Sequence, residues 1–529
     1  MSTQQPNIVL IMADQLAAPA LPFYGHPVVQ TPHLSEMARN GILFENAYCN
    51  SPLCAPSRAS MLTGQLPSRI GAYDNAAYFH GDLPTLAHYL RAMGYSTCLS
   101  GKMHHVGPDQ LHGFEERLTT DIYPSDFGWT PDWENFSERP SWYHNLLSVV
   151  QAGMCETSNQ LDYDEEVAYR SIRKIYDLAR QPDQHPFFMC VSFTHPHDPY
   201  TISPEYWDRY DHDQIDLPAV PPIPYEKMDA HSQRLYHVCG LGEYELTGER
   251  IRQARHAYYG MISYIDDKVG QLLQTLKRTN LFENTVVVFL SDHGDMLGER
   301  GLFYKMNFFE WSARVPLLFY APGRFHSRRI GYPVSLVDLL PTLVEMGSPG
   351  LTPVYADPLD GDSLLPLFSG LPQGEGVEFA DRPVFGEMLC EGAVAPLLMV
   401  RHGEFKYIYS PSDPEQLYNL ANDPNELNNL TSTPENQAKR AAYWQQVTTR
   451  WDVTRLHQQV IASQHRRRSV YRALRVGRFH PWDFQPEQDA TTQYMRNHLD
   501  LNVLEKTSRF PSPQSPEPDG ENQSEWLNL

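Results

Sequence analysis

The chain has 529 residues, of which 41% are hydrophobic and 20% charged, the composition of a globular protein with a sizeable buried core. It carries 42 Lys and Arg against 64 Asp and Glu, a net charge of −22, which argues against general nucleic-acid binding because phosphates attract the opposite sign. No run of about 18 apolar residues occurs, which excludes a membrane-spanning helix.

The cysteines and the start of the chain predict a cytoplasmic location. Seven cysteines form an odd set without the spacing of a disulfide framework, which fits a reducing compartment. Residues 1–6 lack the basic residues of a secretory signal, and the first apolar run stops at Asp14. We therefore expect a cytoplasmic protein that binds neither nucleic acid nor membrane.

Up to about residue 345, short apolar runs alternate with helical stretches. The runs are β-branched and bounded by turn residues, as in strands buried on both faces. The predicted strands are Asn7–Ala13, Tyr95–Leu99, Phe187–Phe193, Thr285–Leu290 and Val315–Tyr320. The predicted helices are Thr85–Met93, Asp164–Ala179 and Ile251–Leu276. This alternation predicts an α/β fold with a largely parallel sheet.

Beyond about residue 375, shorter alternating runs predict a small appended sheet from Arg382–Met388 and Pro396–Tyr409. A helical stretch over residues 434–476 follows, and it contains the basic patch His465–Arg468, which we interpret as a solvated helix face. Three parts are predicted, with boundaries at 1–372, 373–430 and 431–529. They are a catalytic domain, a small α+β subdomain, and a C-terminal helix with an extended tail that reaches a neighbouring subunit.

Reactive residues follow four of the predicted strands. They are Asp14-Gln15, Lys102 with His104, His195 to Asp198, and Ser291 to Asp295. The carboxyl ends of parallel strands share one edge of the sheet, where ligands bind in such folds, so these groups are expected to converge. Any one of them alone is more typical of a helix cap or a structural histidine. Together, acids, imidazoles, an amide and a lysine suit a divalent cation and an oxyanion.

The most specific string is Cys54-Ala-Pro56-Ser-Arg58. Pro56 is typical of the first turn of a helix and Gly64 of its end, so Cys54 lies at the amino terminus, where free N–H groups favour negative charge. Arg58, four residues on, shares a face with Cys54. From these residues alone, a thiolate nucleophile of low pKa and a buried cysteine beside a surface arginine both remain open.

This string resembles the C-x-P-S-R signature of type I sulfatases, in which a maturation enzyme oxidises the cysteine to formylglycine. Other matching segments occur in order along the chain. They are Asn7–Gln15, Leu62–Gly64, Gly101–His104, Pro196–Pro199, Ser291–Gly294, Arg314–Pro316 and Gln416–Glu426. The resemblance implies an alkaline-phosphatase-like fold, with a large, mostly parallel mixed sheet flanked by helices and a small C-terminal sheet.

The resemblance also implies a metal site. Its ligands correspond to Asp14, Gln15, Asp292 and His293, with an oxygen of modified Cys54. Gln15 departs from an acid common in the family, and His293 stands where many relatives have Asn. Ca²⁺ is the expected ion, with Mn²⁺ and Mg²⁺ as alternatives.

Further roles follow from the same resemblance. Arg58 and Lys102 are expected to hold the hydrated aldehyde of position 54, and His104 to act as the base that releases sulfate. His197 and Lys305 are expected to bind sulfate or to assist the leaving oxygen. His195 and His105 are interpreted as scaffold.

Within this family the closest resemblance is to choline sulfatases. It rests on Met12–Tyr24, Leu118–Trp129 and Leu297–Lys305. It implies choline-O-sulfate as substrate and a homo-oligomer, dimer or tetramer. Because a quaternary ammonium donates no ordinary N–H bonds, its pocket needs aromatic faces and carboxylates. The predicted pocket residues are Trp129, Glu387 and, from a neighbouring subunit, Asp500. Asn75 is also expected to bind substrate, by contributing an N–H beside His197 and Lys305.

Two other functions remain open at this level. The chain is alternatively a phosphonate or phosphate monoester hydrolase of the same superfamily, or a non-catalytic ligand-binding relative on the same scaffold.

Overall fold

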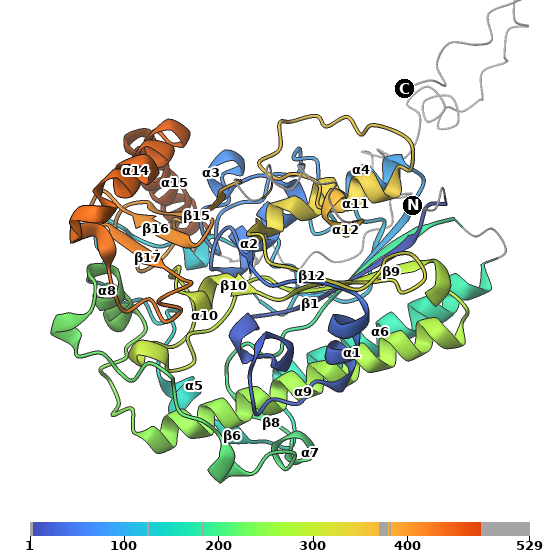
Figure 1. Cartoon of the computed structure of the whole chain (residues 1–529), viewed down its shortest axis with the longest axis horizontal. Helices are drawn as coiled ribbons and strands as arrows, with labels where there is room; N and C mark the ends of the chain where they lie inside the picture. The colour runs from blue at the N-terminus through green and yellow to red at the C-terminus, as the bar shows by residue number, and fades with distance from the viewer. Residues whose placement is uncertain (1–3, 124–125, 182–184, 370–378, 380–381, 478–529) are drawn as a thin grey trace, which may run out of the picture. The chain divides into compact units, whose positions relative to one another are not determined.

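The computed structural model describes residues 4–123, 126–181, 185–369, 379 and 382–477. Its centre is an eight-stranded sheet in the order β12-β2-β11-β9-β1-β7-β4-β5 (Figure 1). The strands are β1 (Asn7–Ala13), β2 (Ile42–Phe44), β4 (Ser96–Gly101), β5 (Glu116–Arg117), β7 (Phe187–Ser192), β9 (Thr285–Ser291), β11 (Leu317–Tyr320) and β12 (Arg328–Ile330). The strands from β9 to β5 run parallel, as predicted from the sequence.

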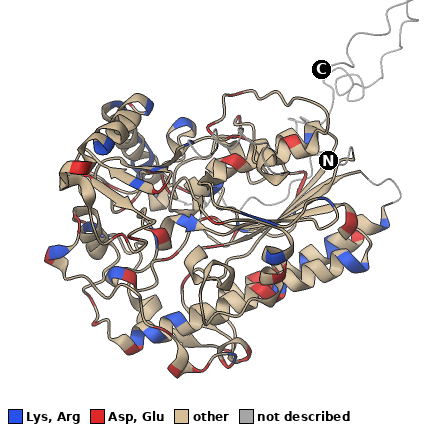
Figure 2. Ribbon diagram, viewed as in Figure 1, with Lys and Arg blue, Asp and Glu red and all other residues tan. Residues whose placement is uncertain are grey.

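The three central strands, β1, β7 and β9, contain no charged residue and are buried along their whole length. Figure 2 shows Lys, Arg, Asp and Glu spread instead over helices such as α6 (Asn159–Arg180) and α9 (Gly248–Arg278). Strands buried on both faces need this uniformly apolar pattern, because helices cover the sheet on both sides.

The predicted strand Val315–Tyr320 is interrupted in the structure. Pro316 has no N–H to donate to a sheet ladder, and it separates β10 (Arg314–Val315) from β11. Strand β10 joins a three-stranded sheet with β3 (Ala47–Tyr48) and β13 (Val334–Ser335). Strand β11 pairs antiparallel with β9, which makes the main sheet mixed.

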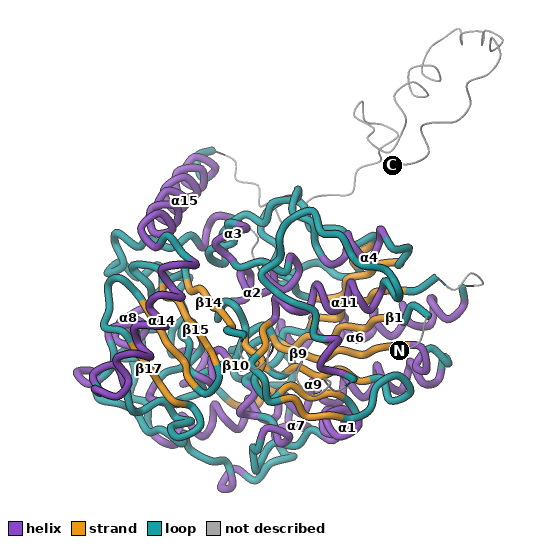
Figure 3. The backbone as a smooth tube through the Cα atoms, turned by 45° about the horizontal axis from the view of Figure 1, so that its top comes forward, coloured by secondary structure: helices purple, strands orange, loops and turns teal. Residues whose placement is uncertain are grey.

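Helices cover both faces of the main sheet (Figures 1 and 3). On one side lie α6 and α9 with α1 (Pro32–Asn40), and on the other α2 (Cys54–Thr63), α4 (Leu86–Ala92), α11 (Leu339–Gly347) and α12 (Leu365–Phe368). Further helices before the C-terminal part are α3 (Pro67–Ile70), α5 (Leu147–Val150), α7 (Pro204–Trp207), α8 (Ala230–Val238) and α10 (Glu310–Ala313). Two short strands, β6 (Gly153–Met154) and β8 (Thr201–Ile202), pair beside α9.

The long helices begin earlier than their apolar periodicity predicts, because they have capping residues upstream. The side chain of Ser158 accepts a hydrogen bond from the N–H of Leu161, so α6 starts at Asn159. Thr247 caps α9 in the same way. Each cap satisfies an N–H group that lacks a partner within the helix.

The C-terminal part contains a four-stranded antiparallel sheet, which confirms the predicted small sheet. Its strands are β14 (Val384–Met388), β15 (Leu397–His402), β16 (Phe405–Tyr409) and β17 (Gln416–Asn419). Its helices are α14 (Gln437–Arg450) and α15 (Val453–Leu474). The single helical stretch predicted over residues 434–476 is divided into these two helices at Trp451 and Asp452. Across the described residues, no helix has both the length and the apolar character that crossing a bilayer requires.

Candidate active site

The reactive residues that follow β1, β4, β7 and β9 come together at the carboxyl edge of the sheet, beside the amino terminus of α2. The donor atoms of Asp14, Cys54, Asp292 and His293 all lie within 4.8 Å of one another, and all four residues are buried. Lys102 follows β4 and forms an ion pair with Asp14. The convergence predicted from the order of strands therefore holds for these residues.

Helix α2 presents Cys54 to this cluster. The helix begins at Cys54, has no side-chain cap, and ends at Gly64, whose φ of 66° lies in the left-handed region that favours glycine. The Cys54 Sγ lies 3.2 Å from His293 Nε2 and 3.5 Å from Lys102 Nζ. Burial raises the pKa of this thiol, but the charges of Lys102, Lys305 and His293 outweigh it and hold the pKa well below its ordinary value.

Arg58, one helical turn along α2, binds the carboxylates of the cluster. Its Nε lies 2.7 Å from Asp292 Oδ2, and its Nη2 lies 3.5 Å from Asp14 Oδ2. Burial opposes ionisation of Asp292, but Arg58 and His293 hold its pKa below the ordinary value. Arg58 Nη1 also donates to the backbone oxygen of Lys102 at 2.5 Å, which ties α2 to the end of β4.

The donor set suits a divalent cation. Two carboxylates and an imidazole face one point, and these are ligands that Ca²⁺, Mg²⁺ and Mn²⁺ accept. The amide oxygen of Gln15 accepts from Lys305 Nζ at 2.5 Å, and its amide nitrogen donates to Asp295 Oδ2 at 2.6 Å. An amide oxygen has a second lone pair, so the bond from Lys305 leaves the Gln15 oxygen able to accept another partner.

Lys305 and His197 form a second group next to Gln15. Lys305 Nζ lies 2.8 Å from His197 Nε2, and both side chains are buried. His197 Nδ1 lies 2.7 Å from the backbone oxygen of Asp198 and 3.3 Å from the hydroxyl of Tyr123. A cation and an imidazole are thus fixed side by side, an arrangement suited to binding an oxyanion.

Several backbones at this edge are strained. Gln15, His104, Tyr304 and Met306 all have φ between 56° and 70°, a region that residues other than glycine rarely adopt. The backbone N–H of His104 donates to Asp121 Oδ2 at 2.7 Å, which helps to hold that conformation. Such strain gathers at functional sites, where the surrounding structure enforces it.

An aromatic wall, made of Tyr123, Trp129 and Trp142, borders the site. The rings of Trp129 and Trp142 stack with their centroids 6.1 Å apart. Trp129 also meets the ring of His104 edge to face at 5.7 Å, and Lys102 Nζ lies 4.2 Å from the centroid of Tyr123. Trp129, predicted as a pocket residue, therefore lies beside the predicted base.

Asn75, predicted to contribute an N–H to the substrate, supports α2 through its side-chain oxygen. Its side-chain oxygen accepts the N–H of Ala55 at 2.9 Å, directly behind Cys54. His195, interpreted as scaffold, lies 2.6 Å from Asp164 in a fully buried pair. Asp500 lies outside the described residues.

Glu387 is a correction to the sequence-based prediction of a pocket carboxylate. Its oxygens accept from Ser68 Oγ, from the Ser68 N–H and from Trp451 Nε1, each at 2.6 Å, and the residue is fully buried. These three hydrogen bonds hold the buried carboxylate to the scaffold. Position 387 lies at the end of a predicted strand, as the site residues do, but its side chain binds the scaffold.

Glu391, which the sequence analysis did not identify, has a carboxylate oxygen that is free to bind a ligand. It is 5% exposed, and among the described residues its Oε2 has no hydrogen-bond partner. Burial raises its pKa to about 7. The backbone oxygen of the preceding Cys390 accepts from Trp133 Nε1 at 2.9 Å, so Glu391 lies next to the segment that follows Trp129. The available signal was its place just after β14, since the other site residues also follow strand ends.

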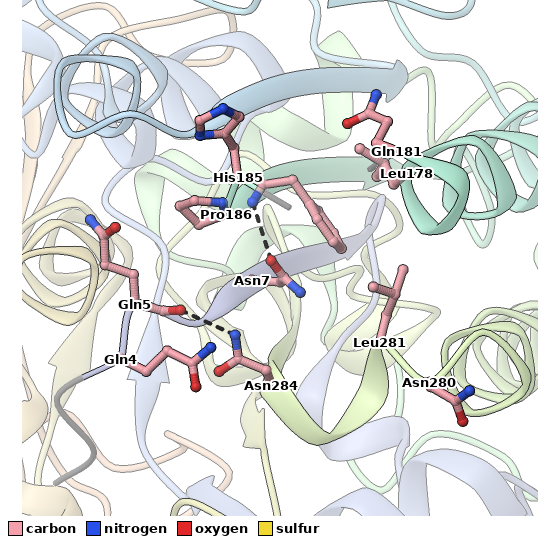
Figure 4. Close-up of a pocket in the computed structure, with 11 residues that line it drawn as sticks. Gln4, Gln5, Asn7, Leu178, Gln181, His185, Pro186, Asn280, Leu281 and Asn284 are labelled. Atoms are coloured by element: carbon pink, nitrogen blue, oxygen red, sulfur yellow. Dashed lines mark hydrogen bonds between the residues drawn. The ribbon is translucent and has the colours of Figure 1, made fainter. Parts of the chain in front are cut away.

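A separate pocket of about 280 Å³ lies at the opposite edge of the sheet, where β1, β7 and β9 begin (Figure 4). Amide side chains dominate its lining, among them Gln5, Asn7 and Asn284. Asn7 Oδ1 accepts the N–H of Phe187, and Asn284 Nδ2 donates to the backbone oxygen of Gln5. This pocket has no carboxylate and no nucleophile, so we place the chemistry at the carboxyl edge.

Comparison with known sequences agrees with this geometry. The family model described as Sulfatase matches residues 6–347, and that described as Choline sulfatase enzyme C terminal matches residues 458–510. The choline-sulfatase of Rhizobium meliloti (strain 1021) is 47% identical, covering 97% of this chain and 99% of that protein. An arylsulfatase of Clostridium perfringens is 30% identical, covering 82% and 91%.

Solved structures give the same result for the fold. A phosphonate monoester hydrolase of Agrobacterium radiobacter is 25% identical, with a TM-score of 0.67, and the alignment covers 86% of this chain and 96% of that one. A putative sulfatase of Bacteroides fragilis is 24% identical with a TM-score of 0.66, covering 87% and 99%. The fold predicted from the sequence is confirmed. The chain belongs to the sulfatase family and is a sulfuric ester hydrolase.

Proposed function

We propose that this enzyme hydrolyses choline-O-sulfate to choline and sulfate, with a formylglycine at position 54 and a divalent cation. The 47% identity to a protein named choline-sulfatase supports the substrate, as does the match of residues 458–510 to a choline sulfatase C-terminal model. Sulfatases in general use a formylglycine and a divalent metal, and the Cys54-x-Pro-x-Arg58 string supports the same modification here.

The unpartnered Oε2 of Glu391 is the observation that carries the choice of substrate. A primary ammonium would bring N–H donors to such an oxygen, but a quaternary ammonium brings only positive charge and methyl groups. Choline therefore suits a buried carboxylate with one unpartnered oxygen next to the segment that follows Trp129, because choline is attracted by charge and by ring faces. We assign Glu391 and Trp129 to the ammonium group.

The residues around position 54 are proposed to prepare the nucleophile. Once Cys54 is oxidised, the hydrated aldehyde supplies the oxygen that attacks sulfur and a second hydroxyl whose deprotonation releases sulfate. Arg58 and Lys102 surround this position with positive charge and favour an ionised oxygen. His104 accepts the proton of the second hydroxyl, since its two ring nitrogens are buried and have no hydrogen-bond partner among the described residues.

His197 and Lys305 are proposed to act on the other side of the sulfate. The ammonium group of Lys305 binds a sulfate oxygen, and its contact with His197 keeps the two groups together. His197 donates a proton to the alkoxide of choline as the S–O bond breaks. This assistance matters because an alkoxide is a poor leaving group.

Asp14, Gln15, Asp292 and His293 are the proposed ligands of the divalent cation. When bound, it would neutralise negative charge on the sulfate oxygens and on the nucleophile. Ca²⁺ is the proposed ion. The cytoplasmic location and the dimer or tetramer stay predictions from the sequence.

A phosphonate monoester hydrolase is the second candidate, supported by the structural likeness to the Agrobacterium radiobacter enzyme. Sulfate ester hydrolysis and phosphonate monoester hydrolysis both need a site for a tetrahedral oxyanion. The rates of hydrolysis of the two substrates therefore distinguish the two functions. The proposed enzyme cleaves choline-O-sulfate with a kcat/KM far above that for a phosphonate monoester. The reverse order would favour the second candidate.

The experiment that tests the proposal combines mass spectrometry with turnover. The protein is produced together with a formylglycine-generating enzyme, and the peptide containing residues 51–58 is analysed for loss of the cysteine sulfur in favour of an aldehyde. The active protein should carry the aldehyde, hydrolyse choline-O-sulfate, and lose activity on chelation of divalent cations.

Cys54→Ser is the matched control for this experiment. Because it retains the fold but has no aldehyde, it should bind the cation and show no turnover. Full activity in a protein that carries an unmodified thiol at position 54 would overturn the proposed chemistry.

A further inference from the structure

The basic patch of α15 contacts the loop that holds Trp129. His465 Nε2 lies 2.5 Å from Glu134 Oε2, and Arg468 forms an ion pair with Asp132. These contacts differ from the solvated face that the sequence predicted. The patch binds a segment that belongs to the aromatic wall.

Neighbouring turns of α15 extend the same contact. The side-chain oxygen of Gln464 accepts the backbone N–H of Trp133 at 3.1 Å. A Cβ placed on Gly128 would lie 3.1 Å from the hydroxyl oxygen of Tyr471, which shows how closely the helix and the loop approach. Positions 464, 468 and 471 lie three and four residues apart and so share one face of the helix.

Arg467 makes the most buried of these contacts. Its two terminal nitrogens lie 2.6 and 2.7 Å from the two carboxylate oxygens of Asp74. The side chains of Arg467 and Asp74 are 6% and 0% exposed. Arg467 also lies within 3.3 Å of the hydroxyl of Thr130, the residue that follows Trp129. A buried, bidentate pair of this kind fixes geometry as well as charge.

Asp74 connects this pair to the nucleophile. It directly precedes Asn75, whose side chain accepts the N–H of Ala55 next to Cys54. Arg467 thus contacts, on one side, the turn that supports α2 and, on the other, the loop of the aromatic wall. Its own guanidinium is bound to Asp74, so it acts on the substrate only through these two neighbours.

We propose that Arg467 is a positioning residue for substrate specificity: it sets the distance between the Trp129 wall and the nucleophile helix, and so the affinity for the cationic part of the substrate. This inference rests on the proposed function, since it concerns the choline end of the same site. It assigns to α15, which lies outside the sulfatase core, control over which ester binds well.

The test compares Arg467→Met with wild type on choline-O-sulfate and on p-nitrophenyl sulfate, which has no cationic group. KM for choline-O-sulfate should rise about tenfold or more, with kcat changed less than about threefold. The kcat/KM for p-nitrophenyl sulfate should change less than about threefold. Arg466→Met, an exposed neighbour on the same helix, is the matched control and should behave as wild type.

Two further variants separate positioning from loss of folding. Arg467→Lys keeps the charge and should restore part of the KM. Asp74→Asn combined with Arg467→Met removes the uncompensated carboxylate, so the melting temperature should recover while the KM for choline-O-sulfate stays raised.

Three outcomes would contradict the inference. Equal losses on both esters, or a KM that recovers together with the melting temperature in the double variant, would leave Arg467 a purely structural role. A wild-type enzyme that cleaves p-nitrophenyl sulfate but not choline-O-sulfate would instead overturn the proposed function, and the inference with it.

Discussion

Glu391 is buried, so its ionisation costs free energy. This cost affects both the stability of the fold and the binding of a cationic ligand. Its pKa is about 7 in the folded protein against an ordinary value of 4.5. Between these values the unfolded chain releases a proton that the folded chain retains, so folding loses stability as the pH rises through this window. A role in binding a cationic ligand accounts for the presence of an acid that destabilises the fold.

Glu391→Gln should therefore raise the KM for choline-O-sulfate by about tenfold, since roughly 1.4 kcal/mol of attraction to the ammonium is lost. Turnover of p-nitrophenyl sulfate should be nearly unchanged, and the free energy of unfolding above pH 7 should stay equal or increase. Glu387→Gln is the matched contrast: it should lower the melting temperature and affect both esters alike. A Glu391→Gln enzyme with unchanged KM would remove this residue from the pocket.

The sequence allowed prediction of most residues at the carboxyl edge, because strand order alone brings strand ends together. It could not separate Glu387 from Glu391, since the difference lies in which hydrogen bonds each carboxylate makes. Ser68 and Trp451 donate hydrogen bonds to Glu387 but are distant from it in the sequence. The residues around position 387 therefore do not reveal these bonds. Hydrogen-bond satisfaction is a property of the folded chain.

At the scale of elements, the contact between β4 and β7 sets where Lys102 and His104 lie. Gly101 ends β4 opposite Ser192, with φ of 105°. A Cβ at this position would lie 1.9 Å from the backbone oxygen of Ser192, a distance that no side-chain adjustment relieves. The glycine is therefore required both by its dihedral angle and by the close approach of the neighbouring strand.

Gly101→Ala should lower the free energy of unfolding by about 3 kcal/mol or more and abolish turnover, because the strand must move and carry Lys102 with it. Gly94→Ala is the matched control. It precedes the same strand and has φ of 87°, but nothing lies within 4 Å of its added Cβ, so only the conformational cost of about 1 kcal/mol applies. Similar melting temperatures for the two variants would contradict the argument.

Element types followed from the sequence more reliably than element boundaries. The apolar runs and the helical periodicity predicted the central strands and the long helices. Boundaries depended on single residues, such as Ser158 as a cap and Pro316 as a break, whose effects are local but override the apolar pattern. In the basic patch of α15, His465 and Arg466 are exposed as predicted, but Arg467 is buried. The sequence gives no sign of this burial because Asp74, the partner of Arg467, lies more than 300 residues away.

At the scale of the molecule, a buried charge cluster joins the sulfatase core to the C-terminal sheet. Lys406 on β16 is fully buried and lies 2.7 Å from Glu310 and 2.8 Å from Glu426. Glu310 lies on α10 in the core and also accepts from the hydroxyl of Tyr48 at 3.0 Å. In the sequence, each of these charged residues is typical of a surface position. The change to shorter apolar runs near residue 375 predicted a boundary there, but not the contact across it.

The charge of Glu310 should make this junction sensitive to acid. Burial opposes its ionisation, but Lys406 and Arg314 hold its pKa at about 2 against an ordinary value of 4.5. A carboxylate whose pKa is lowered on folding stabilises the protein above its unfolded pKa, and the contribution is lost as the pH falls toward the folded value. The difference between the two pKa values corresponds to roughly 3 kcal/mol.

Glu310→Gln should therefore lower the free energy of unfolding by roughly 3 kcal/mol at pH 7, and the gap to wild type should narrow steadily below pH 4.5. Urea unfolding of both proteins at several pH values between 7 and 3.5 measures that gap. Glu404→Gln, an exposed acid of the same C-terminal sheet, should match wild type throughout. A gap that stays constant with pH would mean that packing and hydrogen bonds, rather than the charge of Glu310, hold the core and the C-terminal sheet together.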